Sequence, residues 1–387
     1  MRTDPETAQP ASPPFILVAS IEKFEEMMGT LVRALRMAVD IEADSLYHYY
    51  EKVCLFQVST DGQTYVIDPL SVRHLAPLGR LMADPAREKV FHAAPYDLLC
   101  MRRDYGFDFR NIFDTHVAAQ LLGYEQLGLS MLLERLLGIS HSKHRQRDDW
   151  SRRPLEPEQL EYAAADTHYL LHLRDILDRE LRSRDRHSWA QEEFQHLLGA
   201  APQERTFDPE GFRRIKGARD LSQQQLAVLR ALYLLRDRYA RLMDLPPFKV
   251  LNNITLLDLA RKPPLYPREL LRRPGIAARL AQRFGGEIFQ TIRRAHAGDT
   301  DGPRPQEQRA WRPFAPEAQS RLDRLKAWRR SKARELGLPV GVVFPGSLLE
   351  ILAAAPLAET AGLSGIEGMH EWRVREFGRE ILDVLGR

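Results

Sequence analysis

Cysteine is the rarest amino acid in this chain of 387 residues, which contains only Cys54 and Cys100. Both lie in apolar stretches, and they are not spaced as a CxxC motif. This argues against a disulfide framework and against a cysteine zinc site. We therefore expect a protein of the reducing cytoplasm.

Long hydrophobic runs are also missing. No apolar segment approaches the roughly 18 residues that a membrane helix needs, so we expect no membrane association. Residues 1–13 are polar and rich in proline, without the apolar centre of a signal peptide, and we expect them to form a disordered tail. The length of the chain predicts two or three domains.

Charge is unevenly distributed along the sequence. Residues 1–200 contain 23 Lys and Arg against 31 Asp and Glu, a balance of −8. Residues 201–300 contain 19 against 10, a balance of +9, and residues 301–387 contribute +2, so the total is +3. Such asymmetry indicates either nucleic-acid contact in the basic part or ordinary solvated helix faces.

Strands and helices mix in the first half of the chain. Apolar patterns predict strands at 14–20, 37–43, 53–60, 64–69 and 89–94, and helices at 21–35 and 96–106. From residue 114 the pattern is helical and includes one long segment at 156–184. This order predicts an α/β domain over residues 14–198.

Two later segments resemble each other. Each contains a basic amphipathic helix, a Leu-Pro dipeptide and an apolar segment, followed by LLDLA or LLEIL and then proline. We interpret them as an internal repeat of a small helical domain, over residues 207–298 and 318–387. The segment between them, 299–317, is rich in proline, glycine and charge, and we expect it to be a linker.

Acidic residues end one of the predicted strands, in the sequence MAVDIEADS. Side chains alternate along a strand, so Asp40, Glu42 and Asp44 would point to the same face. Like charges at that spacing repel each other, and either water or a cation must offset the repulsion. Asp44 lies two residues beyond Glu42 on this face, where its carboxylate could contact solvent or a basic side chain.

Two further motifs contain candidate acids. Asp97 would lie in the first turn of a helix after the strand end FHAA, where it could equally complement the helix dipole. Tyr162 and Asp166, in EYAAADTHYLL, are four residues apart and share a helix face, which could equally be an ordinary surface. Together with Asp40 and Glu42, these acids fit a cluster that holds two Mg²⁺ or Mn²⁺ ions about 3.5–4 Å apart and hydrolyses phosphodiesters.

The order DIE, FHAAPYD and YAAAD resembles the three motifs of the DEDD 3′–5′ exonucleases. The Tyr-x-x-x-Asp spacing is similar to that of the tyrosine subclass, because the histidine subclass would need a histidine where Glu161 stands. The stretch KHRQRDDWSRRPLEPEQLEYAAADTHYLL resembles ribonuclease D, and the helical repeats resemble the HRDC domains of that family. One departure is Ile41, where many relatives have threonine, although its side chain should face away from the metals.

The resemblance, which runs from about residue 15 to the end, implies a fold and a set of roles. The fold would be an α/β ribonuclease H-like exonuclease domain, a mixed sheet flanked by helices, followed by two all-α HRDC domains. Asp40 would bridge both ions, while Glu42 and Asp166 would complete the tighter site. Asp97 would hold the second ion through water, and Tyr162 would position the attacking water.

Other residues could contact substrate. The basic stretch at 141–153 could hold phosphates through Lys143 and Arg147, or it could be a salt-bridged loop anchored by its tryptophan. Tyr47 could stack on a terminal base, and a hairpin surface explains it equally well. His92, just before the second motif, could reach substrate or could be a half-buried structural histidine.

Three other residues could in principle be catalytic or metal-binding, but their sequence context favours structural roles. Asp114 precedes a helical run and is better interpreted as an N-cap than as a catalytic acid. His168 and His172 have the i,i+4 spacing of zinc ligands. No HExxH glutamate or cysteine accompanies them, which favours structural roles.

The leading functional hypothesis is a metal-dependent 3′–5′ exoribonuclease that releases nucleoside 5′-monophosphates. By resemblance, its partners would be RNAs with a free 3′-OH, in particular tRNA precursors and other small structured RNAs, and it would act as a monomer without a nucleotide cofactor. The same chemistry on DNA is an alternative, because recognition of the 2′-OH can depend on one hydrogen bond. A non-catalytic scaffold that acts through its HRDC domains is another alternative, although all four acids and Tyr162 are present.

Overall fold

The computed structural model describes residues 13–141, 144–199, 207–299, 315–354 and 361–386. The described chain forms two compact units. Unit 1 contains residues 13–43, 53–199 and 315–386, and unit 2 contains residues 44–52 and 207–299. None of the helices in the described part of the chain is both long and apolar enough to cross a bilayer.

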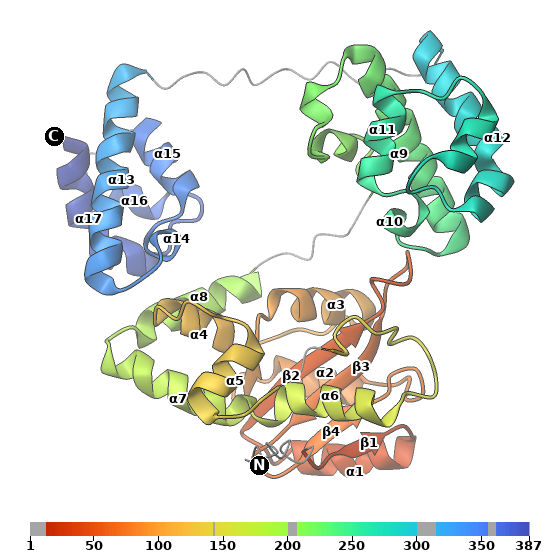
Figure 1. Ribbon diagram of the computed structural model, residues 1–387. Coiled ribbons are helices and arrows are strands. Elements are labelled where there is room, and N and C mark those ends of the chain that lie inside the picture. The colour runs from red at the N-terminus through yellow and green to blue at the C-terminus, as the bar shows by residue number, and fades with distance from the viewer. Residues whose placement is uncertain (1–12, 142–143, 200–206, 300–314, 355–360, 387) are drawn as a thin grey trace, which may run out of the picture. The chain divides into compact units, whose positions relative to one another are not determined.

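A six-stranded mixed sheet forms the centre of the first part of unit 1 (Figure 1). The strand order is β1-β4-β3-β2-β5-β6. The pairs β2–β3 and β3–β4 are antiparallel, and the other three pairs are parallel. The strands are β1 (Ile16–Val18), β2 (Arg36–Ala43), β3 (Val53–Ser59), β4 (Thr64–Ile67), β5 (Glu88–Phe91) and β6 (Ile112–Asp114).

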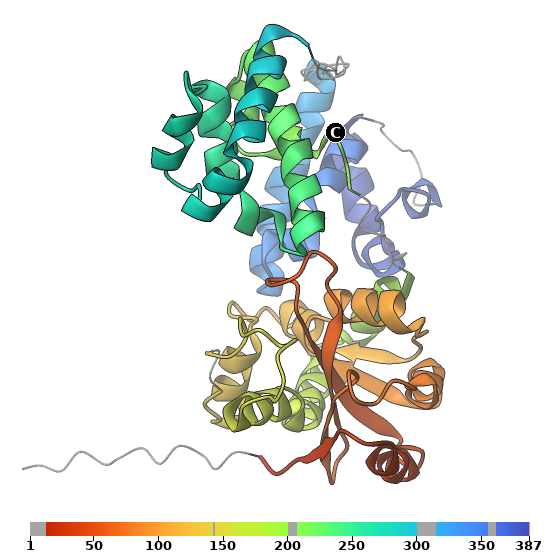
Figure 2. The ribbon, with the colours of Figure 1, turned by 90° about the vertical axis from the view of Figure 1, so that its right-hand side faces the viewer.

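Helices flank this sheet (Figures 1 and 2). Helix α6 packs against β2, β3 and β4, and α7 packs against β2 and β5. Every residue of β3 is buried, as expected for a strand inside a sheet that is covered on both faces. The helices are α1 (Ile21–Leu31), α2 (Ala76–Ala83), α3 (Pro95–Tyr105), α4 (Thr115–Leu121), α5 (Leu129–Leu137), α6 (Pro157–His168), α7 (Leu170–Ser183) and α8 (His187–Gly199).

The α/β prediction for the first part of the chain is confirmed, with three local differences. The expected helix at 21–35 ends at Leu31. The segment at 156–184 is two helices, α6 and α7, which meet at Tyr169. The short strand β6, at the edge of the sheet, was not predicted.

The second helical repeat belongs to unit 1. It contains α13 (Pro316–Leu336), α14 (Val340–Val343), α15 (Gly346–Ala354), α16 (Ala361–Ser364) and α17 (Glu371–Gly386). Helix α17 packs against α8, where the Trp189 and Trp372 rings stack with centroids 4.4 Å apart. At the same contact the Glu193 carboxylate accepts hydrogen bonds from Trp372 Nε1 (2.7 Å) and Arg373 Nη1 (3.0 Å).

Unit 2 contains the first helical repeat and the loop at 44–52. Its helices are η1 (Gly211–Arg214), η2 (Ala218–Asp220), α9 (Gln223–Met243), α10 (Pro247–Val250), α11 (Asn253–Arg261), η3 (Pro267–Arg272) and α12 (Ala278–Ala297). Helices α9, α10 and α11 have 21, 4 and 9 residues, and so do α13, α14 and α15. The two segments that resemble each other in sequence therefore fold alike.

Within unit 2, the loop at 44–52 contacts the helical repeat. Asp244 accepts hydrogen bonds from the backbone N–H groups of Tyr49 (3.0 Å) and Tyr50 (3.1 Å). The Tyr49 hydroxyl donates to Asp237 (2.7 Å). These contacts make the loop an integral part of this unit.

Candidate active site

Three carboxylates come together between the sheet and α6. Asp40 and Glu42 lie on β2, and Asp166 lies on α6, which packs across that strand. One carboxylate oxygen from each of these residues lies within 4.8 Å of the other two. Asp40 and Glu42 are half-buried and Asp166 is buried. Among the described residues, no other group of three or more His, Cys, Asp or Glu has this geometry.

Asp97 lies in the first turn of α3, where it is buried. Burial, followed by the negative charges of Asp40, Asp114 and Asp166, raises the pKa of the Asp97 carboxyl well above its usual range. Its electrostatic coupling to Asp40 and Asp166 indicates that it lies close to the three-carboxylate cluster. The structure therefore brings three of the four selected acids together, and the charges of two of them act on the fourth, Asp97.

The turn that carries Asp97 is held by Asp114. This carboxylate accepts hydrogen bonds from the backbone N–H groups of Ala93 (3.1 Å) and Ala94 (2.8 Å), just before α3. Ala93 has a φ of 63°, an uncommon conformation for a residue other than glycine. Asp114 also caps α4 by accepting from the N–H groups of His116 and Val117, so its prediction as an N-cap is confirmed.

Burial, followed by mutual repulsion, dominates the electrostatics of the cluster. Burial and the charge of Asp166 raise the pKa of Asp40 well above its ordinary value. Burial and the charges of Asp40 and Asp166 do the same for Glu42. A set of oxygen donors that repel each other in this way suits a hard divalent cation such as Mg²⁺ or Mn²⁺, whose charge would offset the repulsion. The donor set therefore fits the expected metals.

Tyr162 lies beside Asp166 on the same helix. Burial, followed by the negative charges of Asp166, Glu42 and Asp40, raises the pKa of its hydroxyl above the usual range. Asp166 accepts a hydrogen bond from Tyr162 and another from His141, and both bonds oppose the increase in its pKa that burial causes. A phenol in this environment stays protonated and acts as a hydrogen-bond donor.

His141 is a member of this site that the sequence analysis did not select. Its Nε2 atom lies 2.8 Å from Asp166 Oδ1, and its ring stacks on Tyr162 with centroids 5.5 Å apart. The sequence places His141 at the start of the basic stretch, 25 residues before Asp166. No spacing rule connects a loop residue with a helical residue at that distance.

Ion pairs hold residues 144–153 of the basic stretch in place. Trp150 is buried against β3, in a cluster with Cys54, Leu55 and Ala163. Arg153 donates to both oxygens of Asp68 at 2.8 and 2.9 Å. The pairs Arg145–Asp148 and Arg152–Asp149 complete the loop. These contacts favour the salt-bridged interpretation with a tryptophan anchor.

A fifth acid approaches the cluster from this loop. Asp148 accepts a hydrogen bond from Gln159 Nε2 (3.1 Å), and its charge contributes to the raised pKa of Glu42. The sequence analysis did not select it, because two adjacent acids in a loop beside arginines predict surface ion pairs.

Three of the four remaining candidates lie among the described residues. His92 is half-buried and contacts the Thr115 hydroxyl through Nδ1 at 2.9 Å. Arg147 is exposed, and Lys143 lies outside the described residues. In unit 2, the Lys249 ammonium lies 3.8 Å from the centroid of the Tyr47 ring. Roles in substrate binding for these four residues stay predictions.

Two further residues have structural partners. Asp44 accepts a hydrogen bond from the backbone N–H of Lys52 (2.8 Å) and forms an ion pair with the side chain of the same residue. His168 contacts the Thr64 hydroxyl through Nδ1 at 2.8 Å, in agreement with a structural role rather than zinc binding.

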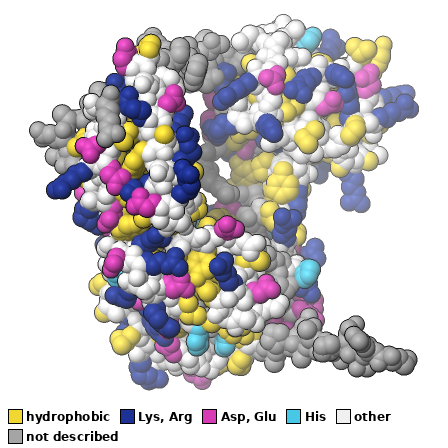
Figure 3. Space-filling view, turned by 60° about the vertical axis from the view of Figure 1, so that its left-hand side comes forward, with side chains coloured by type: hydrophobic (Ala, Val, Ile, Leu, Met, Phe, Trp, Pro, Cys, Tyr) yellow, Lys and Arg dark blue, Asp and Glu magenta, His cyan; other side chains and the backbone are white. Residues whose placement is uncertain are grey.

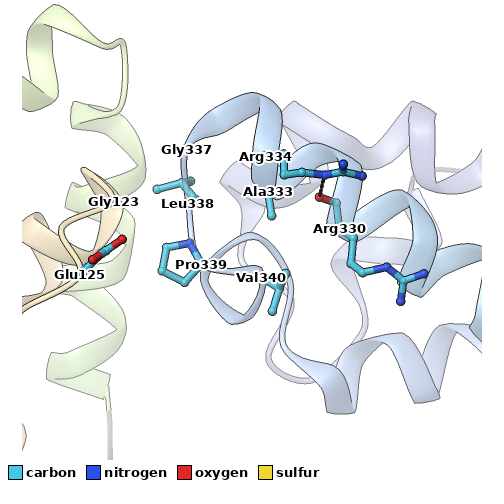
Figure 4. A pocket seen from close by; sticks show the side chains of 9 residues that line it. All are labelled: Gly123, Glu125, Arg330, Ala333, Arg334, Gly337, Leu338, Pro339 and Val340. Carbon is cyan, nitrogen blue, oxygen red and sulfur yellow. Dashed lines mark hydrogen bonds between the residues drawn. The ribbon is translucent and has the colours of Figure 1, made fainter.

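A hollow in unit 1 lies away from the acids. Its volume is about 650 Å³, and Figure 4 shows the side chains around it. The lining residues are Gly123, Glu125, Arg330, Ala333, Arg334, Gly337, Leu338, Pro339 and Val340. None of the acids of the cluster is among these residues. We therefore take the carboxylate cluster, and not this hollow, as the candidate active site.

Comparison with known proteins agrees with this geometry. Residues 15–182 match the family described as 3′-5′ exonuclease, and residues 225–292 and 318–385 each match the HRDC domain. The chain is 32% identical to ribonuclease D of Desulfotalea psychrophila over 71% of its length and 75% of that protein. It is 31% identical to ribonuclease D of Pseudomonas paraeruginosa, over 90% of its length and 92% of that protein.

A solved structure is also similar. The catalytic core of RRP6 from Trypanosoma brucei aligns with a TM-score of 0.67 and 28% identity, over 74% of this chain and 81% of that one. Longer eukaryotic relatives match as well, and the alignments span between 29% and 46% of their lengths.

Proposed function

The chain belongs to the ribonuclease D family of 3′–5′ exonucleases, and on this premise we propose that it trims the 3′ ends of tRNA precursors and other small structured RNAs. The products would be nucleoside 5′-monophosphates. We place the reaction in the cytoplasm, performed by a monomer that needs no nucleotide cofactor. The observation that supports a catalytic rather than a scaffolding role is the set of three carboxylates within 4.8 Å of one another.

We assign the metal site to four acids. Asp40, Glu42 and Asp166 would hold one divalent ion, and Asp40 and Asp97 a second, with Mg²⁺ or Mn²⁺ as the ions. When bound, the ions supply Lewis-acid activation of water and charge compensation at the departing oxygen.

The protein itself supplies position and hydrogen bonds. Tyr162 keeps its proton, because burial and the nearby carboxylates raise the pKa of its hydroxyl. While this hydroxyl donates to Asp166, its oxygen can accept a hydrogen bond from the attacking water and so orient it. The buried walls of α6 and β2 fix the carboxylates before substrate arrives. A free 3′-OH is required because the terminal nucleotide must reach the metal ions with that hydroxyl unblocked.

Digestion of a 3′-end-labelled tRNA precursor tests the proposal. The wild type should release labelled nucleoside 5′-monophosphate only when Mg²⁺ or Mn²⁺ is present, and Asp40→Asn should reduce turnover by about a thousand-fold, since several kcal/mol of charge stabilisation are lost. RNA binding, measured by fluorescence anisotropy, should persist in Asp40→Asn because one negative charge has been removed from the site.

Matched controls define the substrate and the direction. Asp108→Asn, at an exposed acid on the loop after α3, should digest RNA as the wild type does. A 3′-phosphate should block digestion, and a DNA oligonucleotide of the same sequence should be digested more slowly. Rapid cleavage of a circular RNA, or equal rates for wild type and Asp40→Asn, would contradict the proposal.

A further inference from the structure

His141 is hydrogen-bonded to Asp166, the acid that α6 contributes to the carboxylate cluster. Its Nε2 lies 2.8 Å from Asp166 Oδ1, and only 7% of the His141 side chain and 10% of the Asp166 side chain are exposed. A hydrogen bond shielded from water in this way is stronger than one on the surface. The contact is therefore a fixed part of the site.

The same histidine also limits the movement of Tyr162. The two rings are nearly parallel, with an interplanar angle of 22° and centroids 5.5 Å apart. Tyr162 also contacts the ring of buried Trp150, with centroids 6.1 Å apart. The Tyr162 ring thus contacts an imidazole and an indole, and the imidazole also contacts Asp166.

The direction of the hydrogen bond follows from the chemistry of the two groups. A carboxylate that serves as a metal ligand is ionised and can only accept hydrogen bonds. Nε2 of His141 must then carry the proton and donate it to Oδ1. Groups bonded to metal-ligating side chains orient those ligands, and their loss typically costs 10–100-fold in metal affinity.

We propose that His141 is a positioning residue of this nuclease, which orients the Asp166 carboxylate for the divalent ion by donating a hydrogen bond from Nε2 to Oδ1. The inference rests on the proposed metal site. It assigns His141 no contact with the RNA and no part in proton transfer. It also explains why the basic stretch begins with a histidine that turns inward, whereas Arg147 is exposed.

Mn²⁺ binding to the full-length protein, measured by calorimetry without RNA, tests this inference. His141→Leu should weaken binding by ten-fold or more. His141→Gln should restore most of the affinity, because its amide nitrogen can occupy the position of Nε2 and donate the same bond. His74→Leu, which removes an exposed histidine from the loop before α2, should bind Mn²⁺ as the wild type does.

Steady-state digestion of RNA provides a second readout. Since His141 contacts Asp166 and not the RNA, His141→Leu should lower kcat while KM for the RNA stays within two-fold of the wild-type value. Should His141→Leu not fold, as judged by circular dichroism, His141→Asn replaces it. The shorter asparagine side chain cannot place a donor at the position of Nε2.

Each outcome of the calorimetry discriminates between two claims. If Asp166→Asn weakens Mn²⁺ binding while His141→Leu does not, the role of His141 is wrong and the metal site stands. If both variants bind Mn²⁺ as the wild type does, the metal site itself is wrong. Equal losses in His141→Leu and His141→Gln would show that the ring, and not its hydrogen bond, matters.

Discussion

Asp166 is subject to two opposing influences. Burial raises the pKa of its carboxyl, while the hydrogen bonds from His141 and Tyr162 favour the ionised form. For Asp40, a backbone hydrogen bond at Ile41 opposes the increase in pKa only in part, and both Asp40 and Glu42 depend on a cation for compensation. At the scale of single residues, Asp166 is therefore the ligand that the protein itself prepares most completely.

Tyr162→Phe tests the role of the hydroxyl that lies beside this acid. The variant should keep its fold, because the ring still contacts His141 and Trp150. It should bind Mn²⁺ more weakly than the wild type, because Asp166 loses one of its two hydrogen-bond donors. Turnover should fall by about 10–100-fold, since a misoriented nucleophile costs on that order. Tyr124→Phe is the matched control, because its hydroxyl donates to Glu180 and not to the cluster. A wild-type rate for Tyr162→Phe would refute the assigned role.

Which site residues could be predicted from sequence depended on their distance along the chain. Asp40 and Glu42 are two residues apart on one strand, and Tyr162 and Asp166 are four apart on one helix, so local periodicity placed each pair on one face. His141 and Asp148 reach the same site from a loop, whose path follows from long-range contacts such as Arg153–Asp68. Local periodicity carries no information about such contacts.

The turn between β5 and α3 is the structural element on which Asp97 depends. Ala93 adopts a positive φ there, which costs on the order of 1 kcal/mol or more and persists only when surrounding contacts enforce it. Those contacts are the hydrogen bonds that Asp114 accepts from Ala93 and Ala94. Asp114, at the end of β6, therefore fixes the turn that carries Asp97, which follows the neighbouring strand β5.

Asp114→Asn should disturb both stability and catalysis. Asp114 Oδ2 accepts from the Ala94 N–H at 2.8 Å, and an asparagine amide group there would place two donors face to face. Since the site is fully buried, the free energy of unfolding should fall by about 1–3 kcal/mol in urea denaturation. Exonuclease turnover should fall because Asp97 is no longer held.

A control variant tests whether the lower turnover of Asp114→Asn is specific to this turn or follows from the loss of any carboxylate that accepts a backbone hydrogen bond. Asp84→Asn removes a carboxylate that also accepts a backbone N–H, from Ala86, but lies at an exposed turn before β5. It should leave turnover unchanged. If Asp114→Asn lowered stability without lowering turnover, Asp97 would not depend on this turn.

The elements that sequence patterns missed are those whose local signals were weak. The backbone at Tyr169 remains in the right-handed helical region, with φ −98° and ψ −5°, so the boundary between α6 and α7 has no proline or glycine to mark it. Strand β6 has only three residues, and its sequence, Ile112–Asp114, runs directly into a helix. The strongly periodic and repeated segments were predicted, because their patterns extend over many residues.

At the scale of the whole molecule, an acidic catalytic part must attract a polyanion. Residues 201–300 carry a balance of +9 while residues 1–200 carry −8, and Figure 3 shows Lys and Arg side chains spread over the helical domains. A truncation at about residue 205 would not isolate the contribution of the basic part. It would also remove α17 and uncover Trp189, which stacks on Trp372. Substitution of selected arginines avoids this problem.

Two groups of three arginines in unit 2 carry the same charge but differ in their contacts. Three arginines are ion-paired: Arg213 with Glu210, Arg214 with Asp208 and Arg273 with Asp258. Three others are exposed and make no ion pair with any residue that the structure describes. These are Arg219, Arg272 and Arg279. The second group can contact phosphates without first giving up an ion-pair partner.

A triple glutamine variant of the exposed group therefore should weaken RNA binding most at low salt. Each lost phosphate contact removes about 0.7 from the slope of log K against log salt on single strands, so the slope should become shallower by about 2. The triple glutamine variant of the paired group removes the same charge and should leave the slope near the wild-type value. Both variants should digest a short oligonucleotide normally at saturation, because the carboxylates and Tyr162 remain. Titration of a structured RNA at several salt concentrations measures the difference. Identical slopes for the two variants and the wild type would show that the basic residues of unit 2 form ordinary solvated surface.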